Sequence, residues 1–576
     1  MRYIGSAVAV LALTALAAPL LRAQTVRGTV TRSIDQSAIR GAVVLLLDER
    51  SAVRARTLST VQGVFVLRAP SPGTYRIQTL RIGFRPYTSA PFELTADTSM
   101  ALSLNQVPVS LPAVTAQETA GCNENPREGL ATAILWDEAK TAILAADITI
   151  QELNYGFDVM LHSRKYDTRE PPELIESLFL REQHQGTQPW TSFPPDTIEL
   201  RGYVTPTDSG LRYVAPDLNV LLSPYFTRTH CFRVRQPSRT PATRLALEFW
   251  PVGTIRRSEI KGVLWFERDT RALRSVTFNY VNLPATVRDT VAGGEIEFAQ
   301  LPNGAWILPR WLIRAPVPVR GQLADTVRRA GSAVNVLTYP PIGIPQTSRL
   351  RVTGGDLLAV RAGSETGGPP LWTRPVSSLA VTVVEGDSLG TSPVPGATVA
   401  FAGSPLQEVT DLQGHVRFDG MVEGDYVIEA TTPLYAALGL RPERVRVRFP
   451  ATMAHVRQTM RVKTLPELVR QACGLDTKRA ALIGTVIRDG APLMRAPVLV
   501  DPAPARTVEA DTLGSAETTT GADGRYAVCN MPLGTDYIVT VTAPDGTKVR
   551  RPVRIETAEP VTFLDIVFPA PEVRER

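Results

Sequence analysis

The 576-residue sequence contains few of the residues and motifs that carry catalytic chemistry. Neither a Gly-x-Ser-x-Gly turn nor a Gly-x-x-x-x-Gly-Lys loop occurs, so two common signatures of hydrolases and phosphate-binding proteins are missing. No histidine begins a His-x-x-Glu or His-Glu-x-x-His pattern, which excludes the usual zinc-hydrolase motifs. The five histidines are His162, His184, His230, His415 and His455. We therefore predict a protein that is not an enzyme, with no catalytic residue, no metal site and no cofactor.

Lysine is also scarce, since only six of the 62 basic residues are lysine. The excess of basic over acidic residues is 62 − 56 = 6, and it is spread thinly along the chain. No basic cluster with interleaved aromatic residues occurs, so we expect no nucleic-acid partner.

A long apolar run occurs only at the N-terminus. Arg2 precedes an uncharged stretch over 7–21, and Leu21-Arg22-Ala23 ends it with a small residue, as a secretory signal requires. The run is shorter than the roughly 20 residues that span a bilayer. We expect cleavage after Ala23 and no transmembrane segment in the mature chain. The product would be exported to the periplasm, to the outer membrane or to the extracellular space.

The sequence has four cysteines, and none of them forms a Cys-x-x-Cys pair. They are Cys122, Cys231, Cys473 and Cys529. Such cysteines fit an oxidising compartment, and four of them allow three pairings. Their closeness within the expected domains favours Cys122–Cys231 and Cys473–Cys529, while free or metal-bound thiols remain the alternative.

Glycine and proline, in contrast, are abundant. The 41 glycines and 47 prolines interrupt the chain often, which favours many short strands. Three stretches repeat one pattern, in which two turn glycines lie ten residues apart: Gly63 and Gly73, Gly414 and Gly424, Gly524 and Gly534. After the second glycine, each copy has an alternating strand with an aromatic residue. We expect these residues, Tyr75, Tyr426 and Tyr537, to pack in a core, with ligand stacking as the alternative.

The repeated pattern reads "G-x-V … G-A-x-V … T-D-x-x-G-x-[FY] … L-x-x-G-x-Y" and resembles the carboxypeptidase regulatory-like module, over about 26–107, 378–450 and 480–568. The resemblance implies a seven-stranded β-sandwich of the transthyretin-like or starch-binding-like kind. It implies little about function, because such modules accompany peptidases, receptors and adhesins alike. The second copy lacks the opening glycine, which leaves a shortened sandwich as an alternative.

Residues 121–350 lie outside the repeat. Residues 126–146 predict an amphipathic helix with Leu130, Ala133, Ile134, Ile143 and Ala146 on its apolar face, and 173–182 predict a shorter second helix. After Tyr203 the hydrophobic residues alternate with period two, as in an antiparallel sheet with one buried face. This region resembles the curved sheet of periplasmic lipoprotein carriers. Four tryptophans would then line an apolar groove, or else pack as core and edge aromatics. They are Trp250, Trp265, Trp306 and Trp311.

Other residue pairs suggest chemistry only weakly. His230 and Cys231 are neighbours on an expected strand, so their side chains point to opposite faces. Asp208 with Asp217, and Glu295 with Glu297, are acidic pairs of the kind found in glycosidases, although solvated carboxylates are far commoner. Asp411 and Asp523 are expected to form turns rather than to bind calcium.

The predicted fold is therefore mainly β, with three seven-stranded-type β-sandwich modules and a central α+β domain that contains a curved antiparallel sheet. The expected segments are a signal peptide at 1–23, sandwiches at 24–107, 377–463 and 480–576, the central domain at 121–350, and linkers at 108–120, 351–376 and 464–479. We predict a non-catalytic envelope protein whose modules bind an envelope glycan or another envelope protein, or act as spacers. The alternatives are a lipid or lipoprotein carrier and a hydrolase, both in the central domain.

Overall fold

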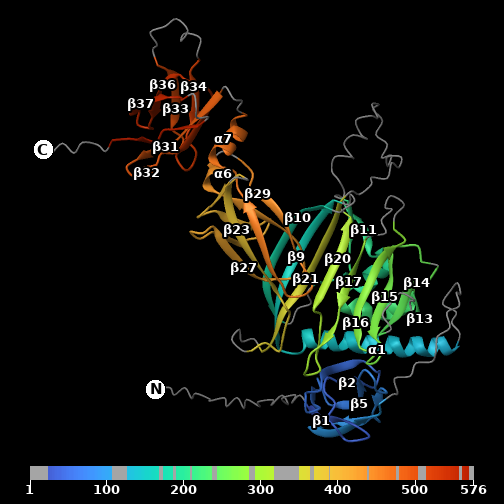
Figure 1. Cartoon of the computed structure of the whole chain (residues 1–576). Helices are drawn as coiled ribbons and strands as arrows, with labels where there is room; N and C mark the ends of the chain where they lie inside the picture. Colours follow the sequence, from blue (N-terminus) through green and yellow to red (C-terminus); the bar gives the residue numbers. More distant parts are fainter. Residues whose placement is uncertain are drawn as a thin grey trace, which may run out of the picture. The chain divides into compact units, whose positions relative to one another are not determined.

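The computed structural model describes most of the chain, and the fold is mainly β, as predicted (Figure 1). The described residues are 24–106, 126–167, 173–185, 190–207, 210–235, 243–253, 255–283, 292–316, 349–363, 369–387, 390–437, 440–474, 479–503, 514–556 and 561–569. They form two compact units. The first contains residues up to 161 and 181–374, and the second contains 162–180 and the residues from 375 onward. The predicted signal peptide lies outside the described residues.

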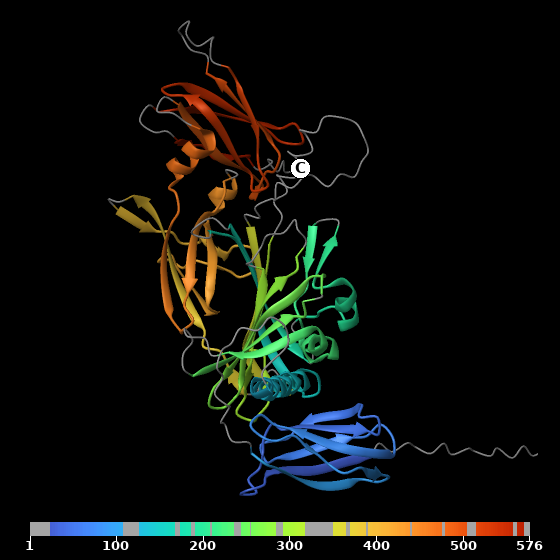
Figure 2. The same cartoon turned by 90° about the vertical axis from the view of Figure 1, so that its right-hand side faces the viewer.

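The first sandwich belongs to the first unit and consists of two sheets (Figure 2). One has the order β4-β1-β8, with β1 at Thr25–Arg32, β4 at Val64–Arg68 and β8 at Thr98–Leu104. The other contains β3 (Val53–Leu58), β2 (Val43–Asp48) and β5 (Gly73–Leu80), with β6 (Tyr87–Thr88) and β7 (Phe92–Leu94) on β5. A Cβ atom at Gly28 would lie 2.0 Å from the Met100 carbonyl oxygen. This close approach explains the opening glycine of the repeat.

The second sandwich also has two complete sheets, although its sequence lacks that glycine. One contains β23 (Ser377–Asp387), β24 (Gly390–Pro393), β27 (His415–Met421) and β30 (His455–Arg461). The other has the order β26-β25-β28-β29, at Gln407–Val409, Thr398–Phe401, Gly424–Thr431 and Glu443–Phe449. A short helix, α6 (Pro433–Ala437), follows β28. The first strand pairs in parallel with the last, as β1 does with β8.

The third sandwich repeats this arrangement. Its first sheet contains β31 (Arg479–Arg488), β32 (Ala491–Pro492), β35 (Arg525–Pro532), β38 (Val561–Phe563) and β39 (Ile566–Val567). Its second has the order β34-β33-β36-β37, at Ala516–Thr519, Pro497–Pro502, Asp536–Thr542 and Lys548–Arg554. The three repeat tyrosines, Tyr75, Tyr426 and Tyr537, are all buried. They pack in the sandwich cores, which leaves their rings no free face for a ligand.

A hairpin that begins in the central domain reaches into the second unit. It consists of β9 (Tyr155–Asp167) and β10 (Glu173–Gln185), so the predicted helix over 173–182 is wrong. Phe179 of β10 is buried, and its ring meets the core rings of Phe401 and Tyr426 edge to face at centroid distances of 5.2 and 5.5 Å. This non-local packing of β10 overrides the local helical pattern.

The central domain is built on a ten-stranded sheet with the order β10-β9-β21-β20-β17-β16-β15-β14-β13 and with β22 on β21. Its remaining strands are β13 (His230–Arg235), β14 (Arg244–Pro251), β15 (Glu259–Glu267), β16 (Leu273–Val281), β17 (Gly293–Glu297), β20 (Arg310–Pro316), β21 (Arg349–Ala362) and β22 (Trp372–Thr373). All pairings from β13 through β17 and β20 to β21 are antiparallel. β21 and β22 overlap the segment that was expected to be a linker, 351–376.

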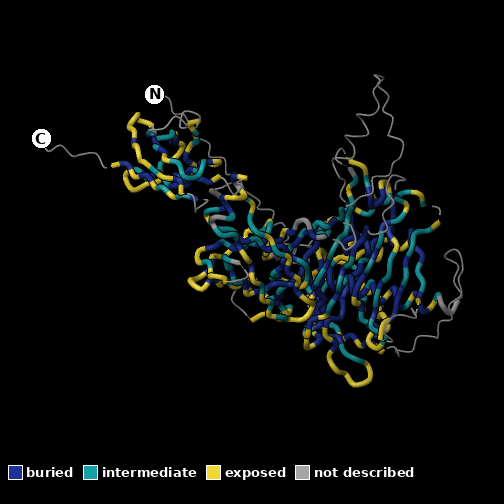
Figure 3. The backbone as a smooth tube through the Cα atoms, turned by 45° about the horizontal axis from the view of Figure 1, so that its top comes forward, coloured by how far each residue is buried: buried dark blue, intermediate teal, exposed yellow. Residues whose placement is uncertain are grey.

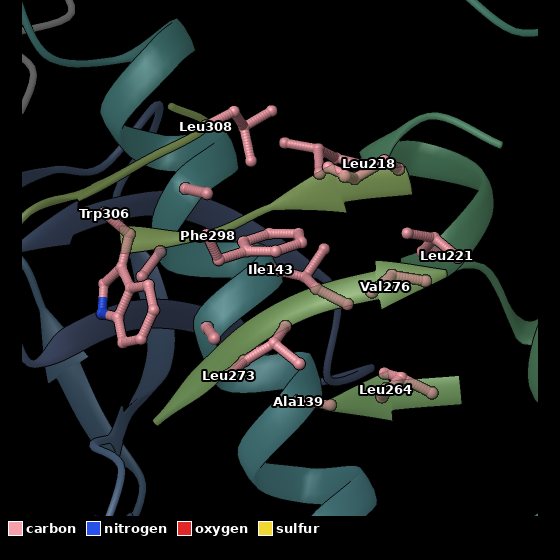
Figure 4. Packing of buried hydrophobic residues seen from close by; sticks show 14 of the residues in the cluster. Ala139, Ile143, Leu218, Leu221, Leu264, Leu273, Val276, Phe298, Trp306 and Leu308 are labelled. Atoms are coloured by element: carbon pink, nitrogen blue, oxygen red, sulfur yellow. The ribbon is translucent and has the colours of Figure 1, made fainter. Parts of the chain in front are cut away.

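Helices cover one face of this sheet. They are α1 (Pro126–Gln151), α3 (Leu218–Leu222) and α4 (Pro224–Thr229), while α2 (Pro195–Arg201) packs on α4. The small pairs β11 (Val204–Thr207) with β12 (Gly210–Tyr213) and β18 (Ala299–Gln300) with β19 (Trp306–Ile307) complete the domain. Ile143 of α1 packs with Leu264, Val276 and Phe298 in one continuous core (Figure 4). Figure 3 marks the buried and exposed residues along the chain.

The buried face of α1 differs from the predicted one. Leu130 and Ala133 are exposed, whereas Ala131 and Leu135 are buried. Ile143 and Ala146 are buried as expected, because the second half of the helix is covered on nearly all sides. It contacts the sheet on one side and β2 and β3 of the first sandwich on another.

Charged side chains fix the first sandwich to α1. Arg56 of β3 lies 2.7 Å from the Asp147 carboxylate and 3.1 Å from that of Glu152. The backbone N–H of Gly83 donates to both oxygens of Glu138, at 3.0 and 3.2 Å. Burial raises the pKa of Glu138 to about 7, against the opposing effects of the Gly83 hydrogen bond and of Arg271. The first sandwich and the central domain are therefore joined by partly buried polar contacts. We call the contacts of Arg56 and Gly83 with α1 the joint.

Candidate functional site

The sheet face opposite α1 presents polar and aromatic side chains. Because side chains alternate along a strand, the neighbours of core residues Leu264, Val276 and Ile296 point to this second face. Ala246, Trp265, Ser275 and Glu297 stand side by side here, on four successive strands. Trp265 and Glu297 are partly exposed, whereas Ala246 and Ser275 are buried. We call this surface the open face.

Trp265 is the central aromatic of the open face. Its side chain is half-buried, and its indole N–H donates to Thr277 Oγ1 at 3.3 Å. Its two cross-strand neighbours, Ala246 and Ser275, are both small. The indole therefore stands between short side chains, with its N–H oriented by a hydrogen bond.

Two carboxylates continue the open face on β17. Glu295 and Glu297 are two residues apart on one strand, so both point to the same side. Burial raises the pKa of Glu297, while the charges of Arg310 and Arg374 act to lower it. The sheet thus holds a half-buried carboxylate near two guanidinium groups.

Those two arginines belong to an ion network with Asp356 of β21. Arg310 Nε and Arg374 Nη2 each lie 3.7 Å from Asp356 Oδ1, and the carboxylate is almost wholly buried. Arg374 Nε also donates to the Leu357 carbonyl at 3.0 Å. The network holds Arg374, which follows β22, against the sheet. It also places the guanidinium groups of Arg310 and Arg374 near Glu297.

A second aromatic group lies on β14, next to the sheet edge. The guanidinium of Arg233 stands 5.3 Å from the centre of the Trp250 ring and 3.2 Å from Glu248. Arg235 contacts the same carboxylate at 3.0 Å. Trp250 is half-buried, so part of its ring remains accessible beside these charges.

The four tryptophans predicted to share a groove lie on two different faces. By register, Trp250 and Trp265 are on the open face. Trp306 is buried in the core under α1, and Trp311 points to the helix side, 5.1 Å from Trp190. The structure therefore brings together only two of the four.

The acidic pairs have separate explanations. Asp217 is the N-cap of α3, where it accepts from the backbone N–H groups of Val220 and Ser192, while Asp208 lies outside the described residues. Glu295 and Glu297 share one side of one strand, whereas a glycosidase places its carboxylates on either side of the bond that it cleaves. Asp411 and Asp523 accept backbone hydrogen bonds within their turns.

A buried His–carboxylate cluster escaped the sequence reasoning, because no motif marks it. Tyr225 donates to Glu259 at 2.6 Å, and His230 lies 3.9 Å from the other oxygen of that carboxylate. Burial lowers the pKa of His230 to about 4 and raises that of Glu259. All three side chains are almost fully buried, and His230 Nε2 also contacts the Ile260 carbonyl. Arg257 also lies 3.1 Å from Glu259 Oε1, whereas Glu259 Oε2 has no hydrogen-bond partner among the described residues.

The described cysteines are all oxidised. The predicted Cys473–Cys529 disulfide is confirmed, and it joins α7 (Leu465–Cys473) to β35. Cys231 is also disulfide-bonded, whereas Cys122 lies outside the described residues. Within the described ranges, no group of three or more potential metal ligands occurs and no helix is long and apolar enough to cross a membrane.

The comparison with protein families concerns the first sandwich. Residues 25–105 match the carboxypeptidase regulatory-like domain. This match confirms the resemblance for the first of the three repeat copies. It covers one of the two-sheet sandwiches and none of the central domain. No curated protein matches the sequence of the chain.

Several solved structures are similar to parts of the chain at low identity. The shaft pilin SpaA from Lactobacillus rhamnosus GG is 12% identical, with 33% of this chain and 96% of the pilin covered and a TM-score of 0.16. The Bacillus anthracis TIE protein is 12% identical, with 63% of each chain covered and a TM-score of 0.16. A dioxygenase domain from Streptomyces sp. SirexAA-E is 16% identical, with 16% of this chain and 79% of that chain covered and a TM-score of 0.13.

Proposed function

We propose that this chain is an exported, non-catalytic protein of the cell envelope that binds a glycan on the open face of its central sheet. The sandwiches act as spacers that hold this domain in place. The arrangement around Trp265 carries the proposal. An aromatic face beside planar hydrogen-bonding groups is the chemistry that sugars need, because their C–H faces stack on rings and their hydroxyls bond to carboxylates and amides.

The length of the open face supports an extended ligand. From Trp265 the row crosses β16 to Glu297 on β17, and both of these residues are partly exposed. With strands about 4.8 Å apart, that distance is about 10 Å. A ligand of two or more sugar rings fits such a row.

The joint at α1 supports the spacer role of the first sandwich. Arg56 contacts Asp147 and the Gly83 N–H contacts Glu138, so the two domains are connected at two positions along α1. A Cβ at Gly41 would lie 2.2 Å from the Gly304 carbonyl oxygen, so the two backbones also approach closely. Several contacts of this kind hold the sandwich in one orientation.

The packing under the helices argues against a lipid carrier and therefore favours binding on the open face. A lipid carrier keeps an apolar cavity under its helices, whereas Phe249, Phe278 and Trp306 are packed there with almost no exposure. These side chains fill the space that a lipid tail would need.

A glycan array with the whole protein tests the proposal. We expect binding to a neutral or weakly charged glycan and at least a tenfold loss with Trp265→Ala, or about 1.4 kcal/mol. Tyr87→Ala, which removes a partly exposed aromatic from the first sandwich, is the matched control and should bind normally. No glycan binding by the wild type, or equal binding by Trp265→Ala, would contradict the proposal.

A further inference from the structure

The last sheet of the third sandwich ends in a strongly basic edge strand. Among the strands that the structure describes, β37 pairs only with β36 in the order β34-β33-β36-β37, so no described strand lies on its other side. Four of its seven residues are basic, and all four are exposed. They are Lys548, Arg550, Arg551 and Arg554.

Acidic partners neutralise little of this charge. Arg554 forms an ion pair with Asp536 at 3.1 Å. Lys548, Arg550 and Arg551 stand opposite Thr542, Thr540 and Val539, none of which is charged. In the described part of the chain, these three form no ion pair with a carboxylate. Three exposed cations therefore lie close together on one strand.

The second sandwich has the same feature on the equivalent strand. β29 follows the strand with the repeat tyrosine and is likewise an edge strand. Arg444, Arg446 and Arg448 alternate along it, and all three are exposed. Arg444 pairs with Glu429, Arg446 stands opposite Val427, and Arg448 stands opposite Asp425, so the cations of β29 are balanced more than those of β37. The corresponding strand of the first sandwich, β7, contains no basic residue.

Protection against edge-to-edge pairing explains part of this pattern, because a charge or a proline on an edge strand prevents another strand from adding to it. Pro552 already removes one backbone donor from β37. Four basic residues in seven, with a second basic strand at the equivalent place, exceed what such protection requires.

We propose that β37 and β29 bind a linear anionic polysaccharide, at a site separate from the open face. On β37, Lys548 and Arg550 point to one side of the sheet and Arg551 to the other, since side chains alternate. Cations on both sides of an edge suit a chain that bends around it, whereas a flat bilayer reaches one side only. The absence of aromatic residues from β37 disfavours single-stranded nucleic acid, which binds largely by base stacking.

Alginate, a polyuronate, is the probe, with neutral dextran beside it and the whole protein as binder. We expect binding to alginate that weakens steeply between about 50 and 300 mM salt, since counterions are released, and no binding to dextran. Lys548→Gln/Arg550→Gln/Arg551→Gln should lower the affinity for alginate at least tenfold. The matched control, Arg27→Gln/Arg68→Gln/Arg85→Gln, removes three exposed charges from the first sandwich and should lower it less than twofold.

Three outcomes would overturn the proposal. One is an equal loss of alginate affinity in both triple variants, because net charge alone would then explain binding. Another is charge-dependent binding to anionic vesicles or single-stranded DNA without binding to alginate. The third is a wild type that does not bind alginate together with a β37 variant that aggregates. The basic residues would then serve only to prevent strands of other molecules from adding to β37. Trp265→Ala should bind alginate normally, so the two sites are tested separately. Thermal unfolding of each variant confirms that it is folded.

Discussion

Arg56 Nη1 lies 2.7 Å from Asp147 Oδ2, and this contact joins β3 of the first sandwich to α1 of the central domain. The carboxylate is almost fully buried, and it also accepts from the Gln151 side chain at 2.6 Å. The guanidinium is itself held by Glu152, the residue that directly follows this helix. A buried charge with two partners depends on both of them, so this pair is the most vulnerable point of the joint.

Replacing Asp147 by alanine should lower the free energy of unfolding of this unit by about 2–3 kcal/mol, because Arg56 is left without its closest partner at a partly buried position. Chemical denaturation measures the change. Asp419→Ala is the control, since its ion pair with Arg417 is exposed and should contribute less than about 1 kcal/mol. A loss no larger than that of the control would show that the joint does not rely on this pair.

Glu138 should make the stability of the first unit depend on pH. Its pKa of about 7 lies above the ordinary value of 4.5, so the folded state holds the proton more tightly than the unfolded state does. The stabilisation is present below pH 4.5 and is lost as the pH rises to about 7, by roughly 3 kcal/mol. Glu138→Gln should flatten this part of the pH profile in thermal unfolding. An unchanged slope would mean that other carboxyls cause it.

The hairpin should stabilise the second sandwich through Phe179. Removing its ring leaves a cavity against Phe401 and Tyr426, and Phe179→Ala should cost about 3–4 kcal/mol in chemical denaturation. Leu180→Ala, one residue further along β10, removes a largely exposed side chain and should cost under about 1 kcal/mol. Similar costs for both variants would contradict the packing role of Phe179.

Reduction of Cys473–Cys529 should destabilise the third sandwich. The disulfide closes a loop with a sequence separation of 56 residues, for which the chain-entropy model gives about 4 kcal/mol. Calorimetry of the oxidised protein and of Cys473→Ser/Cys529→Ser measures the difference. A shift confined to the transition of the third sandwich is expected. An unchanged transition would show that α7 is held without the covalent bond.

Much of the sandwich architecture follows from local sequence. The turn glycines Gly63, Gly414 and Gly524 all have φ between 72° and 74°, so the spacing identified a backbone conformation that few other residues adopt. The tyrosine that follows each turn pair is buried, because an alternating strand has only one inward face. These features depend on a few neighbouring residues, which is why the pattern alone could predict them.

The candidate site depends on contacts that no local pattern contains. Period-two alternation predicted the strands of the central domain, but it did not show which face α1 covers. It therefore could not separate Trp250 and Trp265 from Trp306. The strand over 173–182 was missed for the same reason, since β10 is held by β9 and by Phe401, far away in the chain.

The sequence by itself determined the three repeats and their turns, because these follow from spacing along the chain, and it favoured the buried tyrosines and the Cys473–Cys529 pairing over their alternatives. The tertiary structure decided which strands are edges, which side of the central sheet is open, and which charges meet at α1. Those properties arise when segments distant in sequence pack together, and the free energy of burial then selects one face of each strand and helix.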